Sequence, residues 1–94
     1  GRWRLVASPD GAEGSTTIGQ DAKLWASLLA PGEALGYELA AGRLAYVHVI
    51  RGRLAVNGQI LGTGDAAKIA AETRLDFQAD EETEFLLFDL PPLA

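Results

Sequence analysis

The sequence contains no cysteine, no methionine and a single histidine, His48, among its 94 residues. Without cysteine, a disulfide framework, a thiolate nucleophile and a cysteine-ligated zinc site are excluded. One histidine cannot supply the several convergent ligands of a histidine-rich metal site. A Ser-His-Asp arrangement would have to pair His48 with a serine, and none of the serines lies in a nucleophile-elbow context. We therefore expect His48 to be a strand residue that packs beside Tyr46 and Ile50.

Basic residues and long apolar runs are also scarce. Eight lysines and arginines against 13 aspartates and glutamates give a net charge of −5 at pH 7, which argues against nucleic-acid binding because that needs a basic face. No apolar run reaches the length of a membrane-spanning helix, and the N-terminus lacks a secretory signal pattern. These absences favour a cytoplasmic protein that does not enter a membrane. A newly translated protein begins with methionine, so a chain that begins with Gly1 is predicted to be a fragment or one domain of a longer protein.

Turn-forming residues are abundant, and the clearest turn signal is Asn57-Gly58. This pair favours a type I′ hairpin turn because both residues tolerate a positive φ. Apolar runs over 45–50 and 54–56 precede it, and residues 59–61 are expected to pair back. A second turn is predicted at Gly64-Asp65, so the chain reverses twice within a short stretch.

The other apolar segments are short and bounded by turn residues, which predicts further strands. Segment 23–29 has a composition that also suits a helix, but Pro31-Gly32 limits it to seven residues, which favours a strand. A chain of this length makes one domain. The expected fold is an all-β sandwich or small barrel whose strands cover 3–6, 16–20, 23–29, 34–39, 45–50, 54–56, 59–61, 66–70, 73–78 and 83–90.

The last predicted strand is apolar on both faces. Phe85 and Leu87 point to one side and Leu86, Phe88 and Leu90 to the other, whereas a strand with one solvated face should alternate. We expect the second sheet to cover one side and another domain or subunit to cover the other. The exposed apolar surface is predicted to include Tyr46, His48, Ile50 and one of Trp3 and Trp25.

Several motifs together resemble a known family. Gly52-Arg53-Leu54-Ala55-Val56-Asn57-Gly58, followed by Leu61-Gly62-Thr63-Gly64-Asp65, resembles the hairpin of cupin β-barrels. The segments WRLVASPDG (3–11), GS (14–15), QDA (20–22) and LLFDLP (86–91) resemble the C-terminal cupin domain of pirin-like bicupins, a family that includes quercetin 2,3-dioxygenase-like enzymes. The resemblance covers residues 3–92. It implies one jelly-roll-like cupin domain over 1–94, the C-terminal half of a two-cupin protein.

The resemblance also implies where a metal would be bound. Metal-binding cupins carry two histidines and a glutamate in a glycine-framed motif, and a third histidine in a second motif. On this sequence the two histidine positions fall on Glu38 and Ala40, the glutamate position on Ala45 and the last histidine position on Leu75. Three of these four side chains have no donor atom, which implies a domain with no metal and no other cofactor. His48 does not restore the site, because it lies on the opposite face of the strand from Ala45.

Two hypotheses for function follow. The first is a metal-free, non-catalytic domain that packs on the N-terminal cupin of its parent chain or on a second copy of itself, most simply as a dimer. The isolated domain would be inactive and the parent a quercetin 2,3-dioxygenase-like dioxygenase. Its interior would be filled by Ala40, Ala45, Val47, Val49, Leu75 and Phe77.

The second hypothesis is a barrel that binds a small organic ligand, or a metal-independent catalyst. Glu38 would then be an inward carboxylate that acts as a general base or hydrogen-bond acceptor, the alternative being a solvated residue at the barrel rim. Asp21 also lies beside apolar strands, where a catalytic acid is conceivable, but a turn residue is the simpler interpretation.

Overall fold

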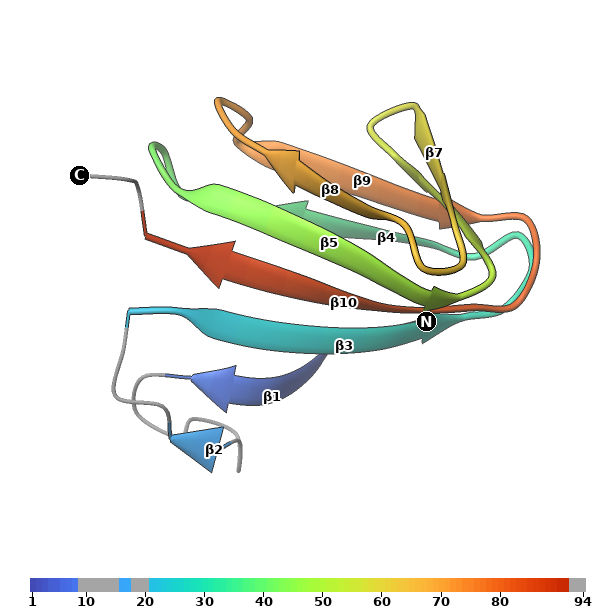
Figure 1. Ribbon diagram of the computed structural model, residues 1–94, viewed down its shortest axis with the longest axis horizontal. Coiled ribbons are helices and arrows are strands. Elements are labelled where there is room, and N and C mark those ends of the chain that lie inside the picture. The colour runs from blue at the N-terminus through green and yellow to red at the C-terminus, as the bar shows by residue number, and fades with distance from the viewer. Residues whose placement is uncertain (9–15, 18–20, 92–94) are drawn as a thin grey trace.

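A computed structural model describes residues 1–8, 16–17 and 21–91, and it is built from strands throughout (Figure 1). No helix occurs in these residues, and therefore none that could cross a membrane. The strands are β1 (Arg4–Ser8), β2 (Thr16–Thr17), β3 (Lys23–Leu29), β4 (Ala34–Glu38), β5 (Leu44–Arg51), β6 (Arg53–Val56), β7 (Gln59–Gly62), β8 (Ala66–Ile69), β9 (Arg74–Ala79) and β10 (Thr83–Leu90).

The all-β prediction is confirmed, and the predicted strand bounds agree with the observed ones to within two residues where both can be compared. Segment 23–29 is a strand and not a helix. The predicted strand residues 18–20 and most of the turn at residues 8–11 lie outside the described residues.

The strands form two sheets. One has six strands in the order β2-β1-β3-β10-β5-β8, and the other has four in the order β4-β9-β6-β7. Neighbouring strands are antiparallel except for the parallel pair β1–β2. The long strands β3, β10 and β5 run side by side (Figure 1). The stretch over residues 45–65 is divided between the sheets, since β5 belongs to one and β6 and β7 to the other.

The core lies between the two sheets because every long strand turns alternate side chains inward. In β10 the inward residues Phe85 and Leu87 are completely buried, while their outward neighbours Leu86 and Phe88 are half-buried. The predicted interior residues Ala45, Val47, Val49, Leu75 and Phe77 are all buried.

Two expectations about burial were wrong. Ala40 is exposed in the turn before β5, because Leu39, one residue earlier, takes the inward position. Neither tryptophan belongs to an exposed patch, since Trp3 and Trp25 are partly buried against the core. The Trp3 ring makes edge contacts with Phe77 and Phe85 at centroid distances of 5.2 and 5.5 Å. Trp3 thus fills space between the sheets.

Both predicted turns are confirmed. Asn57 and Gly58 have φ values of 46° and 86°, as a type I′ turn between β6 and β7 requires. The Asn57 side chain also accepts a hydrogen bond from the Asp76 amide at 2.8 Å and thereby ties the turn to β9. At the second turn Gly64 has a φ of 83°, and the Asp65 carboxylate accepts a hydrogen bond from the Gly62 amide at 2.9 Å.

Candidate functional site

The four positions that the resemblance assigns to metal ligands do not converge in the interior. Ala45 and Leu75 are completely buried there, but Ala40 is exposed and the Glu38 side chain is 88% exposed. Glu38 lies at the rim, 4.0 Å from the guanidinium of Arg74. The structure therefore does not support the hypothesis that uses Glu38 as an inward carboxylate.

The inward residues of this segment are Tyr37 and Leu39, one residue away from the assigned positions. Tyr37 lies directly opposite Leu75 in the β4–β9 pair, and Asp89 lies directly opposite Ala45 in the β5–β10 pair. The two buried aliphatic positions thus each have a polar residue as cross-strand neighbour. These two polar residues meet, because the Tyr37 hydroxyl donates a hydrogen bond to Asp89 Oδ2.

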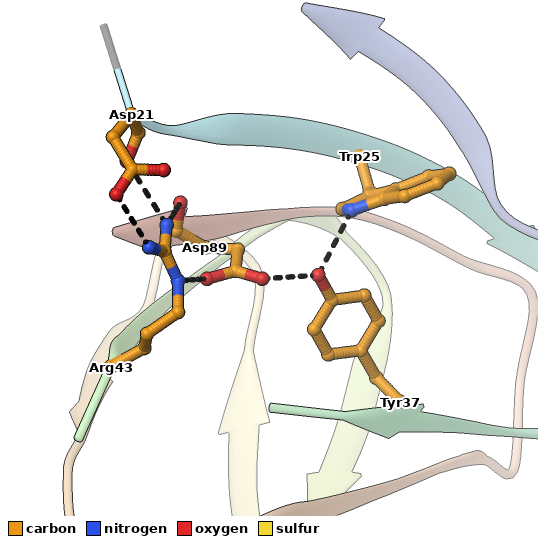
Figure 2. Close-up of polar contacts among 5 residues, drawn as sticks. All are labelled: Asp21, Trp25, Tyr37, Arg43 and Asp89. Carbon is orange, nitrogen blue, oxygen red and sulfur yellow. Dashed lines mark hydrogen bonds and ion pairs between the residues drawn. The ribbon is translucent and has the colours of Figure 1, made fainter. Parts of the chain in front are cut away.

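Figure 2 shows the cluster that forms around Asp89. Arg43 Nε donates to Asp89 Oδ1 at 2.5 Å, and Arg43 Nη2 donates to the Asp89 carbonyl at 3.2 Å. On its other side Arg43 donates to the carboxylate and the carbonyl of Asp21, each at 3.0 Å. Trp25 Nε1 donates to the Tyr37 hydroxyl at 3.2 Å. Both carboxylate oxygens of Asp89 therefore have a donor.

Local sequence explains how these side chains reach one another. Asp89 continues the inward row of β10 that begins with Thr83, Phe85 and Leu87, so its side chain is only 9% exposed. The turn before β5 brings Arg43 to the same end of the sheets, with its amide bonded to the Ala40 carbonyl at 3.1 Å. A buried carboxylate is costly unless it is paired and hydrogen-bonded, and the cluster meets that requirement.

The pKa values of Tyr37 and Arg43 are both raised within the cluster. Burial first, and then the hydrogen bond to Asp89, raise the pKa of Tyr37 well above its usual range. The hydrogen bond to Asp89 raises the pKa of the Arg43 guanidinium further. Tyr37 is therefore a neutral donor and Arg43 a fixed cation at neutral pH.

The raised pKa of Tyr37 predicts a loss of stability in alkali. In the unfolded chain a tyrosine ionises near its ordinary pKa of about 10, whereas in the folded protein Tyr37 stays protonated. This stabilisation is present below the unfolded pKa and is lost as pH rises toward the folded one. We expect Tyr37→Phe to be less stable at neutral pH by about 1 kcal/mol, yet to lose less stability between about pH 9 and 11. Urea unfolding followed by circular dichroism measures both quantities, and equal alkaline losses in the two proteins would contradict the assignment.

Sequence reasoning identified only part of this cluster. The sequence favours a turn residue at Asp21 over a catalytic acid, and in the structure Asp21 is an exposed partner of Arg43. Tyr37, Arg43 and Asp89 were not singled out. One signal for Asp89 was available, namely a carboxylate in the inward row of an otherwise apolar strand.

No three histidine, cysteine, aspartate or glutamate side chains within the described ranges are grouped so that they could hold a metal ion. His48 faces outward on β5, opposite Leu86 and Ala66 on the neighbouring strands. Because Ala45 and Leu75 offer no donor atoms, the residues present at the cupin ligand positions do not fit a metal.

Residues 5–90 match the family described as the quercetinase C-terminal cupin domain. The chain therefore belongs to this family of cupin domains, as the sequence motifs predicted, and the two-sheet all-β fold agrees with it.

Two relatives from Escherichia coli (strain K12) illustrate the similarity. A quercetin 2,3-dioxygenase is 37% identical over 90 residues, which make up 96% of this chain and 39% of that protein. The pirin-like protein YhaK is 34% identical over 96 residues, with 97% of this chain and 41% of that protein covered. The chain thus spans about two fifths of the length of these relatives.

Solved structures give the same result. The crystal structure of YhhW from Escherichia coli superposes with a TM-score of 0.95 at 36% identity, covering 97% of this chain and 39% of that one. A second YhhW structure, a complex with nickel(II), also has a TM-score of 0.95 at 36% identity, covering 98% of this chain and 40% of that one.

Proposed function

We propose that this cupin domain is metal-free and non-catalytic, and that it packs against another cupin unit through the outer face of its six-stranded sheet. The observation that carries the proposal is the apolar character of that face. Its exposed large side chains include Leu28, Tyr46 and Ile50, which are 49%, 38% and 41% exposed. Contiguous apolar surface of this kind marks interaction sites.

The apolar side chains are neighbours across the strands. Leu24, Phe88 and Tyr46 form one row over β3, β10 and β5, and the apolar Ala26 and Leu86 form the next row, which ends on the imidazole of His48. The rings of Tyr46 and Phe88 are in edge contact at 5.8 Å. We call these two rows, together with Leu28 and Ile50, the outer apolar face. It lies over β10, the strand whose two apolar sides predicted a second covering partner.

The partner we propose is the companion cupin of a parent chain, or a second copy of this domain when the companion is absent. The relatives, which are longer than this chain, support a companion unit. The dioxygenase activity for which one relative is named would then depend on the companion, since Ala45 and Leu75 carry no metal-binding atoms.

The isolated domain is therefore expected to self-associate at micromolar concentration, most simply as a two-fold dimer. Ile50→Glu and Phe88→Glu should shift it to monomer, because each places a charge on the outer apolar face. Sedimentation velocity measures the change, and circular dichroism checks the fold. Ile60→Glu is the matched control, because Ile60 is 52% exposed but lies on β7 of the other sheet.

A wild-type domain that stays monomeric at every concentration would contradict the proposal. Equal effects of Ile50→Glu and Ile60→Glu would do so as well. If Phe88→Glu is the one variant that unfolds, Phe88 belongs to the core, and the result for Ile50→Glu decides the question.

A further inference from the structure

We infer that the guanidinium of Arg43 is the built-in cation of this cupin and supplies, beside the interior ligand positions, the positive charge that a metal ion supplies in a metal-binding one. The inference rests on the proposed metal-free function and explains how the domain balances the charge of the buried Asp89 carboxylate. The residues at the cupin ligand positions do not fit a metal, yet a cluster of charged side chains lies beside them.

The polar cluster lies next to the ligand positions of metal-binding cupins. Leu75 and Ala45 are the two ligand positions that lie inside the domain, and their direct cross-strand neighbours are Tyr37 and Asp89. The hydrogen bond from Tyr37 to Asp89 joins these neighbours across the two sheets. The polar cluster therefore borders the interior site where the ligands of a metal would gather.

The guanidinium of Arg43 is surrounded by oxygens. Its three guanidinium nitrogens contact four oxygens, which are one carboxylate oxygen and the carbonyl oxygen of each of Asp89 and Asp21, at 2.5 to 3.2 Å. Carboxylate and carbonyl oxygens are also the ligands that hard divalent cations prefer. Arg43 thus occupies a cation site made of oxygens, as Figure 2 shows.

The charge of Arg43 balances the charge of a buried carboxylate. Asp89 is buried, so its negative charge requires a cation whether or not a metal is available. Arg43 supplies that charge permanently, because a guanidinium is not deprotonated in proteins. It also ties the segment before β3 to the end of β10, which a free ion would do only when bound.

Removal of the guanidinium tests the inference. Arg43→Ala leaves the carboxylate and carbonyl oxygens of Asp21 and Asp89 around a vacated cation position. We expect Arg43→Ala to bind Mn²⁺ with a dissociation constant about tenfold or more below that of the wild type, since carboxylate oxygens suit Mn²⁺. The paramagnetic resonance signal of free Mn²⁺ measures binding, and the urea midpoint of Arg43→Ala should rise with added Mn²⁺.

Two further variants make the result specific. Arg43→Ala/Asp89→Asn should lose the gained affinity, because it lacks the buried carboxylate. Arg53→Ala changes the net charge equally but removes an exposed arginine that lies 3.8 Å from Asp80, and it should gain nothing.

A folded Arg43→Ala that binds Mn²⁺ no more tightly than Arg53→Ala would overturn the inference. If Arg43→Ala does not fold alone, Mn²⁺ must restore its β-sheet circular dichroism without restoring that of the double variant, and no recovery would also overturn it. Stoichiometric transition metal in dialysed wild-type protein would instead refute the proposed metal-free function, whatever Arg43→Ala does.

Discussion

Replacement of Trp3 by alanine is expected to lower the free energy of unfolding by about 3–5 kcal/mol, the range for large aromatic residues truncated in a core. The Trp3 ring contacts Phe77, Phe85 and Tyr37 at centroid distances of 5.2, 5.5 and 5.7 Å. Its indole nitrogen donates a hydrogen bond to the Gly36 carbonyl at 3.0 Å. Trp3→Ala removes these contacts and leaves a cavity between the two sheets.

The loss is large for a domain of this kind, whose total stability is typically about 5–15 kcal/mol. Urea unfolding followed by far-ultraviolet circular dichroism measures it. Ile60→Ala is the matched control, because Ile60 is a large apolar residue that is mostly exposed, and its truncation should cost only about 0.5 kcal/mol. Equal losses for the two variants would mean that Trp3 does not fill the interior.

The strands could be predicted from the sequence because local patterns specify them. β10 is apolar on both sides, and its burial alternates because successive side chains of a strand point to opposite faces. The Asn57-Gly58 turn needs two positive φ values, and few other residue pairs supply them. These features depend on neighbours in the chain, so the sequence alone is sufficient for them.

The sequence predicted the strands better than it predicted which assigned ligand positions point into the interior. The ligand positions of the family motif fall on Glu38 and Ala40, and a metal site would need both side chains to face inward. The structure turns Tyr37 and Leu39 inward instead, and a shift of one residue moves every side chain of a strand to the other face. Counting along a motif is not accurate enough to specify a face when a turn precedes the strand.

The Asp89 cluster was missed because its members are distant in the chain. Arg43 and Asp89 are 46 residues apart, and Tyr37 and Asp89 are 52 residues apart. Sequence spacing does not say which distant polar residues meet, since that depends on which strands become neighbours. The burial of Asp89 was locally predictable, but its partners were not.

Gly52 is the residue that makes the passage from β5 to β6 possible. Gly52 is the one residue between these two strands, which belong to different sheets. It has a φ of 103°, a value that residues with a Cβ rarely adopt. Next to it the completely buried Thr83 hydroxyl bonds both the amide and the carbonyl of Arg53 at 3.0 Å.

Gly52→Ala is expected to lower the free energy of unfolding by about 3 kcal/mol or more, since backbone strain and overpacking each cost about 1–3 kcal/mol. A Cβ at this position would lie 2.5 Å from the Glu82 carbonyl oxygen and 2.7 Å from Thr83 Cα, and backbone atoms cannot easily move away. Gly42→Ala separates the two effects, because Gly42 has a φ of 83° but no atom within 4 Å of its added Cβ. Urea unfolding of both variants should show a clearly smaller loss for Gly42→Ala, of about 1 kcal/mol from backbone strain. If the two losses are equal, β5 and β10 do not approach as closely at Gly52 as the structure shows.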